Sequence, residues 1–309
     1  MKIQAYIIIF LFFTLELSAQ IKGTIQDSAT KELIPYVNIW IENEDKGTTA
    51  DENGNFTLPA ETDTSKRLLF NSVGYAPVYI SISELKDVVS LVANPIALNE
   101  ITIANPTGKH KQVISPLKKL KRVEAYHSGS QARMLARYIP YKPEYATTPY
   151  INKIRFPVEK YKKSFTFNLR LYSVKEDGSP GEPIYDDNIL VTIPPGKKEI
   201  SIDISMLNIK IPEEGLYIVI ERFLIKQNIS GTVYKELLDK NNKLLPVEKR
   251  EYLYDLFGPV FTCEQTATDK GGWNYYKGKW NAGYHLQIVA PPEKAHIHGL
   301  IAAEITLTD

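Results

Sequence analysis

The sequence contains a single cysteine, Cys263, among its 309 residues, and this scarcity excludes an intrachain disulfide. It also lacks an excess of either charge, with 37 Lys and Arg against 36 Asp and Glu. A net charge of +1 creates no overall field that would attract nucleic acid or an anionic membrane. The chain must fold on its apolar cores. We expect Cys263, which follows Val260 and Phe261, to be a buried, inert strand residue rather than a nucleophile.

Sequence patterns of known catalytic sites are missing as well. There is no Gly-x-Ser-x-Gly elbow and no phosphate loop, and none of the five histidines has the spacing of a zinc peptidase. His296 and His298 can share one face of a strand, but Glu293 and Glu304 are only remote third ligands, which favours a surface pair without metal. We therefore expect no enzyme and no cofactor. The alternative is a hydrolase with an unrecognised site that includes His285, His296 and His298.

One apolar run stands at the very start of the sequence and is too short for a membrane helix of roughly 20 residues. Lys2 precedes the apolar residues 7–13, and Leu17-Ser18-Ala19 ends in a small residue suited to cleavage. We predict a signal peptide over residues 1–19, with an uncleaved membrane anchor as the alternative. A mature chain starting at Gln20 has no cysteine there for a lipid anchor and no transmembrane span. The protein is expected in the periplasm or at the outer membrane or cell surface of a bacterium.

Residues 21–82 have the pattern of a small β-sandwich. Within residues 36–42, apolar residues alternate with Asn38, Trp40 and Glu42, which is typical of a half-buried strand. The polar loop that follows contains Asp51-Glu52-Asn53-Gly54, a composition that predicts a tight reversal. Its side-chain oxygens could coordinate calcium, but the loop lacks the 12-residue ligand order and the terminal bidentate Glu of an EF-hand. A hydrogen-bonded turn is therefore favoured.

Three stretches of this region resemble the carboxypeptidase-like regulatory domain, a transthyretin-like β-sandwich family. They are IKGTIQDSATKELIPYVNIWI from residue 21, GTTADENGNF from residue 47 and LLFNSVGYAPVYISI from residue 68. Within these stretches, the residues that match the family follow one another in the same order as in the family. They are Gly23, the turn at Asp27, Pro35, Gly47-Thr48, Asp51-x-x-Gly54-x-Phe56 and Val73-Gly74-Tyr75. The resemblance covers about a quarter of the chain. It implies a transthyretin-like Greek-key sandwich over residues 20–104 with a non-catalytic, accessory role.

The middle of the chain is basic. Residues 109–122 contain six Lys and Arg and no acidic residue. A solvated linker interrupted by Pro116 is favoured over a segment that docks on an anionic surface. We place a basic linker at residues 105–145, with a short helix over residues 124–137.

Alternating patterns return in residues 146–309, which we predict to be a second, jelly-roll-like β-sandwich. In residues 164–174, four apolar side chains alternate with Thr166, Asn168 and Arg170, and residues 198–204 alternate in the same way. Residues 215–224 are nearly all apolar and indicate a strand buried on both faces. Residues 226–250 are polar and favour a long loop or a helical insert. The whole chain is thus expected to be all-β.

A glycine-rich stretch at residues 271–284 concentrates aromatic side chains. Trp273, Tyr275, Tyr276 and Trp280 are the candidate ligand-binding residues, because aromatic rings stack on sugars and anchor protein interfaces. A hairpin turning at Lys277-Gly278, whose rings complete the second core, is favoured over an open platform. In that hairpin Trp273 and Tyr275 would share one face and Tyr276 the other.

These features together predict an exported, non-enzymatic envelope protein that acts in binding, in adhesion or as an assembly scaffold. The first alternative is a carbohydrate-handling accessory protein that uses the aromatic residues as its platform. A polysaccharide or an envelope protein is the expected partner, and nucleic acid is not.

Overall fold

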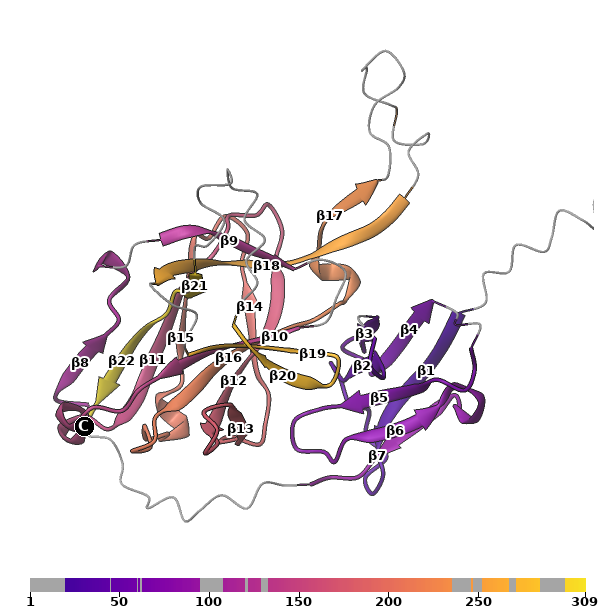
Figure 1. Ribbon diagram of the computed structural model, residues 1–309, viewed down its shortest axis with the longest axis horizontal. Coiled ribbons are helices and arrows are strands. Elements are labelled where there is room, and N and C mark those ends of the chain that lie inside the picture. The colour runs from indigo at the N-terminus through magenta and orange to yellow at the C-terminus, as the bar shows by residue number, and fades with distance from the viewer. Residues whose placement is uncertain are drawn as a thin grey trace, which may run out of the picture.

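The computed structural model describes residues 20–44, 46–59, 61, 63–94, 108–119, 122–128, 133–234, 246, 252–266, 271–283 and 298–309 (Figure 1). The predicted signal peptide lies outside these residues. Within them the protein is built from β-strands and short 3-10 turns, which confirms the all-β prediction. No helix among them is long and apolar enough to cross a membrane.

The N-terminal domain is a sandwich of two sheets (Figure 1). One sheet has the order β4-β1-β7, and the other has the order β3-β2-β5-β6. The strands are β1 (Gln20–Asp27), β2 (Asn38–Ile41), β3 (Gly47–Thr49), β4 (Asn55–Pro59), β5 (Arg67–Asn71), β6 (Val78–Ser81) and β7 (Val88–Leu91). Apolar side chains from both sheets, including Ile25, Ile39, Phe56 and Phe70, form the core between them.

The loop before β4 is the predicted hydrogen-bonded turn. The carboxylate of Asp51 accepts hydrogen bonds from the backbone N–H groups of Asn53 and Asn55, both at 2.9 Å. Gly54 has a φ of +72°, which a glycine adopts without strain. The side chain of Asp51 thereby holds the turn together.

The C-terminal domain contains three sheets rather than the two predicted. A seven-stranded sheet runs in the order β13-β12-β16-β10-β19-β20, with β14 also paired to β12. Its strands are β10 (Met134–Ile139), β12 (Phe165–Val174), β13 (Pro180–Pro183), β14 (Ile189–Ile193), β16 (Leu216–Arg222), β19 (Gly272–Tyr276) and β20 (Lys279–Ala282). The second sheet, β15-β11-β22-β8, consists of β8 (Lys111–Ile114), β11 (Tyr150–Pro157), β15 (Glu199–Asp203) and β22 (Glu304–Thr308). Side chains of these two sheets share one large apolar core.

The third sheet was missed by the sequence analysis. It joins β9 (Arg122–Ser128), β17 (Ile229–Tyr234), β18 (Tyr252–Thr266) and β21 (His298–Ile301). β17 and the first half of β18 extend away from the rest of the domain (Figure 1). The polar composition of residues 226–250 suggested a loop, but a ribbon paired through backbone hydrogen bonds does not require an apolar sequence.

The helix predicted over residues 124–137 is also wrong, because β9 and β10 occupy this part of the chain. β10 pairs with β16 on one side and β19 on the other. Met134, Leu135 and Ala136 favour helix by propensity, yet all three are buried within the sheet, where pairing and packing outweigh propensity. The predicted linker over residues 105–145 therefore includes three strands of the C-terminal sheets, β8, β9 and β10.

Candidate ligand-binding cleft

The β19–β20 hairpin has the predicted geometry. Lys277 and Gly278 have φ angles of 54° and 77°, the left-handed values that a two-residue hairpin turn requires. The two strands pair directly, with Tyr275 opposite Trp280. The backbone thus places the rings of β19 and β20 at adjacent positions of the large sheet.

Three of the four candidate rings come together, and the fourth does not. Trp273, Tyr275 and Trp280 lie on the sheet face turned toward the N-terminal domain, where they line a cleft. The rings of Tyr275 and Trp280 meet edge to face, with centroids 5.2 Å apart. Tyr276 does not line the cleft, and the guanidinium of Arg133 lies over its ring, 5.2 Å from the centroid. The alternation of a strand separates Tyr276 from its neighbours, as predicted.

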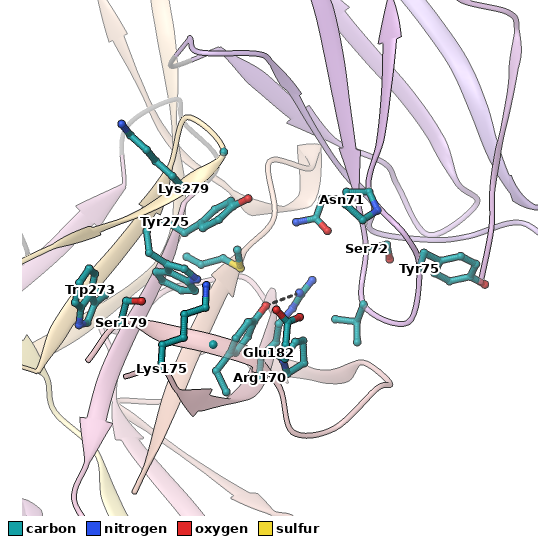
Figure 2. Close-up of a pocket in the computed structure, with 18 of the residues that line it drawn as sticks. Asn71, Ser72, Tyr75, Arg170, Lys175, Ser179, Glu182, Trp273, Tyr275 and Lys279 are labelled. Atoms are coloured by element: carbon teal, nitrogen blue, oxygen red, sulfur yellow. Dashed lines mark hydrogen bonds between the residues drawn. The ribbon is translucent and has the colours of Figure 1, made fainter. Parts of the chain in front are cut away.

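The cleft has a volume of about 500 Å³ and lies between the two domains (Figure 2). The N-terminal domain contributes residues 71–75, Pro77 and Asn94, and the C-terminal domain contributes the β12–β13 hairpin and the β19–β20 hairpin. The side chains that bear polar groups are Asn71, Ser72, Asn94, Arg170, Lys175, Asp177, Ser179, Glu182 and Lys279. Rings on one side thus face amides, hydroxyls and charges from both domains.

Figure 2 separates the side chains that enter this space from those that only border it. Lys175 extends toward Tyr275, and Asn71 points at the same ring from the opposite domain. Lys279 and Tyr75 turn away from the space between the domains. Asn71 and Lys175 are therefore the polar side chains best placed to contact a ligand on the rings.

A buried ionic network forms the floor of the cleft. Arg170 donates from Nε to Oε2 of Glu221 at 2.6 Å and from Nη1 to the hydroxyl of Tyr172 at 3.0 Å. Asn168 donates to the same carboxylate at 2.9 Å. Burial disfavours the charged guanidinium, but Glu221 and Tyr172 outweigh it and raise the pKa of Arg170. The floor is held in one geometry because each charge has its partners.

The same network crosses to the N-terminal domain. Asn38 of β2 donates a hydrogen bond to Oε1 of Glu221, and its own side-chain oxygen accepts one from Thr49 at 2.9 Å. Thr49 in turn accepts a hydrogen bond from the backbone N–H of Leu224 at 2.9 Å. These contacts join residues that are as many as 183 positions apart in the sequence. The domain seam is a specific, bonded interface.

Aromatic contacts extend this seam. Tyr36 stacks on Phe223 with ring centroids 4.7 Å apart and planes 10° apart. Trp40 meets Tyr275 at 5.8 Å, so a ring of the cleft also touches the N-terminal domain. All three tryptophans of the chain thus lie at the seam or in the cleft, and their fluorescence will report on both.

This arrangement gives a pH prediction for the seam. Burial raises the pKa of Tyr275 from 10 to about 12. The unfolded chain releases this proton near pH 10, whereas the folded protein keeps it, so the stabilisation is complete below pH 10 and is lost as the pH rises through 12. We expect the free energy of unfolding to fall across this window, by up to about 3 kcal/mol from Tyr275 alone. Urea unfolding at several alkaline pH values measures the slope, and an unchanged slope in Tyr275→Phe would contradict the assignment.

The other sequence-predicted sites lie elsewhere. Cys263 is fully buried in β18, as predicted. His285, His296 and the side chain of His298 lie outside the described residues. Among the residues that the structure does describe, no three His, Cys, Asp or Glu side chains gather as metal ligands. What the sequence analysis missed is the buried face of β12, where Asn168 and Arg170 had the pattern of a solvent-exposed face.

The molecule is thus an all-β protein in which a small sandwich is bonded to a larger three-sheet domain beside a cleft. Residues 21–103 match the model of the CarboxypepD_reg-like domain family. The N-terminal domain is therefore a carboxypeptidase-like regulatory domain, as the sequence resemblance implied, and this module is non-catalytic. No curated protein matches the chain.

Proposed function

We propose that this protein is a non-catalytic binding protein, exported to a bacterial envelope, that holds a carbohydrate in the cleft between its two domains. The observation that carries the proposal is the convergence of Trp273, Tyr275 and Trp280 with polar groups of both domains on one cleft. Its volume of about 500 Å³ lies within the range of sites for small ligands.

A sugar fits this lining better than a purely apolar ligand does. Sugar rings have apolar C–H faces that pack on aromatic side chains, and their hydroxyls need hydrogen-bond partners. Here the rings lie opposite Asn71, whose amide both donates and accepts, and next to Lys175, which donates. The carboxylate of Glu182 supplies a further acceptor.

The role in the envelope follows from export and from the joined domains. The predicted signal peptide supports export, and the bonded seam between Asn38 and Glu221 supports a rigid body that presents its cleft in a constant shape. A rigid carbohydrate-binding body serves adhesion to glycans or the assembly of surface polysaccharide. The regulatory-like domain then acts as one wall of the site.

Two cleft variants and one matched control test the proposal. The chain from Gln20 is screened on a glycan array, and hits are titrated by tryptophan fluorescence. We expect Trp280→Ala and Asn71→Ala to weaken binding about tenfold or more, because each removes a group that contacts the ligand. The control, Tyr276→Ala, removes a ring of the same hairpin that does not line the cleft and should bind normally.

Asn71→Ala keeps the test interpretable if the loss of Trp280 disturbs the hairpin, since Asn71 belongs to the other domain and is only partly buried. Binding by no glycan on the array, with the wild-type protein folded, would overturn the carbohydrate assignment. Equal losses in Asn71→Ala and Tyr276→Ala would show that any ligand binds outside the cleft.

A further inference from the structure

Six lysines meet at the end of the C-terminal domain where β12 begins. They are Lys160, Lys162, Lys163, Lys197, Lys198 and Lys226, here called the lysine patch, and every one is exposed. They belong to three loops that are far apart in the sequence. The balanced composition of the chain conceals this concentration of charge, and the sequence analysis singled out residues 109–122 instead.

Backbone hydrogen bonds hold the three loops together. Gly196 donates to the carbonyl of Tyr161 at 2.7 Å, and Val158 donates to the carbonyl of Lys198 at 2.9 Å. Thr166, at the start of β12, donates to the side chain of Asn228 at 2.9 Å, which fixes the loop of Lys226. The lysines are therefore presented together by the fold and not by chance contact of mobile loops.

Little negative charge offsets the patch. Its three loops contain two acidic residues, Glu159 and Glu199, so six lysines minus two glutamates leave a local charge of +4. Glu199 is already paired with Arg155 at 3.2 Å. None of the six lysines forms a salt bridge with a described residue, and Lys163 lies over the ring of Phe165 at 5.3 Å. The patch is a concentrated positive surface.

We infer that the lysine patch docks the protein on an anionic lipid headgroup surface. Its cations are lysines without arginine, which act as point charges and do not select a planar, bidentate ligand. The six lysines are exposed and spread over three loops, so a broad charged surface suits them better than a single small anion. Each lysine near such a membrane contributes independently to its attraction.

The orientation on the membrane would leave the cleft free. β13, which carries Gly181, Glu182 and Pro183 of the cleft, pairs with Tyr172 and Val174 at the far end of β12 (Figure 1). The lysine patch lies at the Phe165 end of the same ten-residue strand. Arg170, the residue of β12 nearest that end that lines the cleft, is five residues from Phe165, so roughly 17 Å of strand lies between the two sites. Docking therefore does not depend on the ligand proposed for the cleft.

Vesicle sedimentation tests this inference. The chain from Gln20 is mixed with vesicles of phosphatidylcholine alone or with about 30% phosphatidylglycerol, at low and at high salt. The patch variant carries Lys162→Gln, Lys163→Gln, Lys197→Gln and Lys198→Gln. The control carries Lys22→Gln, Lys109→Gln, Lys111→Gln and Lys118→Gln, which remove the same charge from exposed sites elsewhere, most of them in the basic stretch of residues 109–122.

We expect the wild-type protein to sediment only with the anionic vesicles and to be released by salt. The patch variant should bind the anionic vesicles at least about tenfold more weakly than the wild type. The control and Trp280→Ala should bind them as the wild type does. Absence of sedimentation at low salt, or an equal loss in the control, would overturn the inference. So would retention on an acidic polysaccharide without binding to anionic vesicles. Circular dichroism of both variants confirms that they are folded.

Discussion

Replacement of Glu221 by alanine is expected to lower the free energy of unfolding by about 3–5 kcal/mol. The carboxylate is 1% exposed and is the charged partner of Arg170, which is itself 6% exposed. Its removal leaves a buried guanidinium without a counter-charge and takes an acceptor from Asn38 across the seam. Urea unfolding followed by tryptophan fluorescence measures the loss.

A double variant distinguishes the stranded charge from a simple loss of contacts. Arg170→Met with Glu221→Leu removes both charges and keeps apolar volume, so it should be more stable than Glu221→Ala alone. As a control, Glu42→Ala removes the partner of Arg67, an ion pair at the surface, and should change stability little. A double variant as unstable as Glu221→Ala would contradict the electrostatic explanation.

Replacement of Trp40 by alanine is expected to lower the free energy of unfolding by a similar amount, about 3–5 kcal/mol. Trp40 projects from β2 away from the N-terminal core, yet it is only 2% exposed because Leu224 and Tyr275 of the C-terminal domain cover it. Its removal leaves a cavity in the seam. It also removes the support beneath Tyr275, so we expect weaker ligand binding in the cleft as well.

The matched control for Trp40 is Tyr79→Ala. Tyr79 pairs with Leu69 in the neighbouring strands of the same sheet, but it is 47% exposed, whereas Trp40 is 2% exposed. Its replacement should lower the free energy of unfolding by much less than the replacement of Trp40 does, as is usual for substitutions at exposed positions. Chemical denaturation of both variants decides the comparison, and equal losses would mean that Trp40 is not part of a folded interface.

The seam and the cleft share their parts, which connects stability to function. Tyr275 touches Trp40 of the regulatory-like domain and Trp280 of the cleft, and Arg170 lines the cleft while it holds Glu221. A ligand on these residues therefore contacts side chains that are already immobilised. Such preorganisation lowers the conformational entropy that binding must overcome.

Local patterns in the sequence were sufficient for much of this description. The alternation in residues 198–204 and the apolar run in residues 215–224 correspond to β15 and β16, and β16 is buried on both faces as predicted. The hairpin at Lys277-Gly278 was equally predictable. These features depend on neighbours along the chain, through strand periodicity and turn conformation, so they can be recognised without any tertiary contact.

The polar face of β12 shows where that reasoning ends. Asn168 and Arg170 alternate with apolar residues as on a solvent-exposed strand, and Asn38 and Trp40 do so on β2. All four are buried, because the outer faces of the two domains pack on each other around Glu221. Alternation distinguishes the two faces of a strand but carries no information about what covers either one. The identity of the strands was therefore encoded locally, whereas the seam, the cleft beside it and the lysine patch arise from contacts between residues distant in the chain.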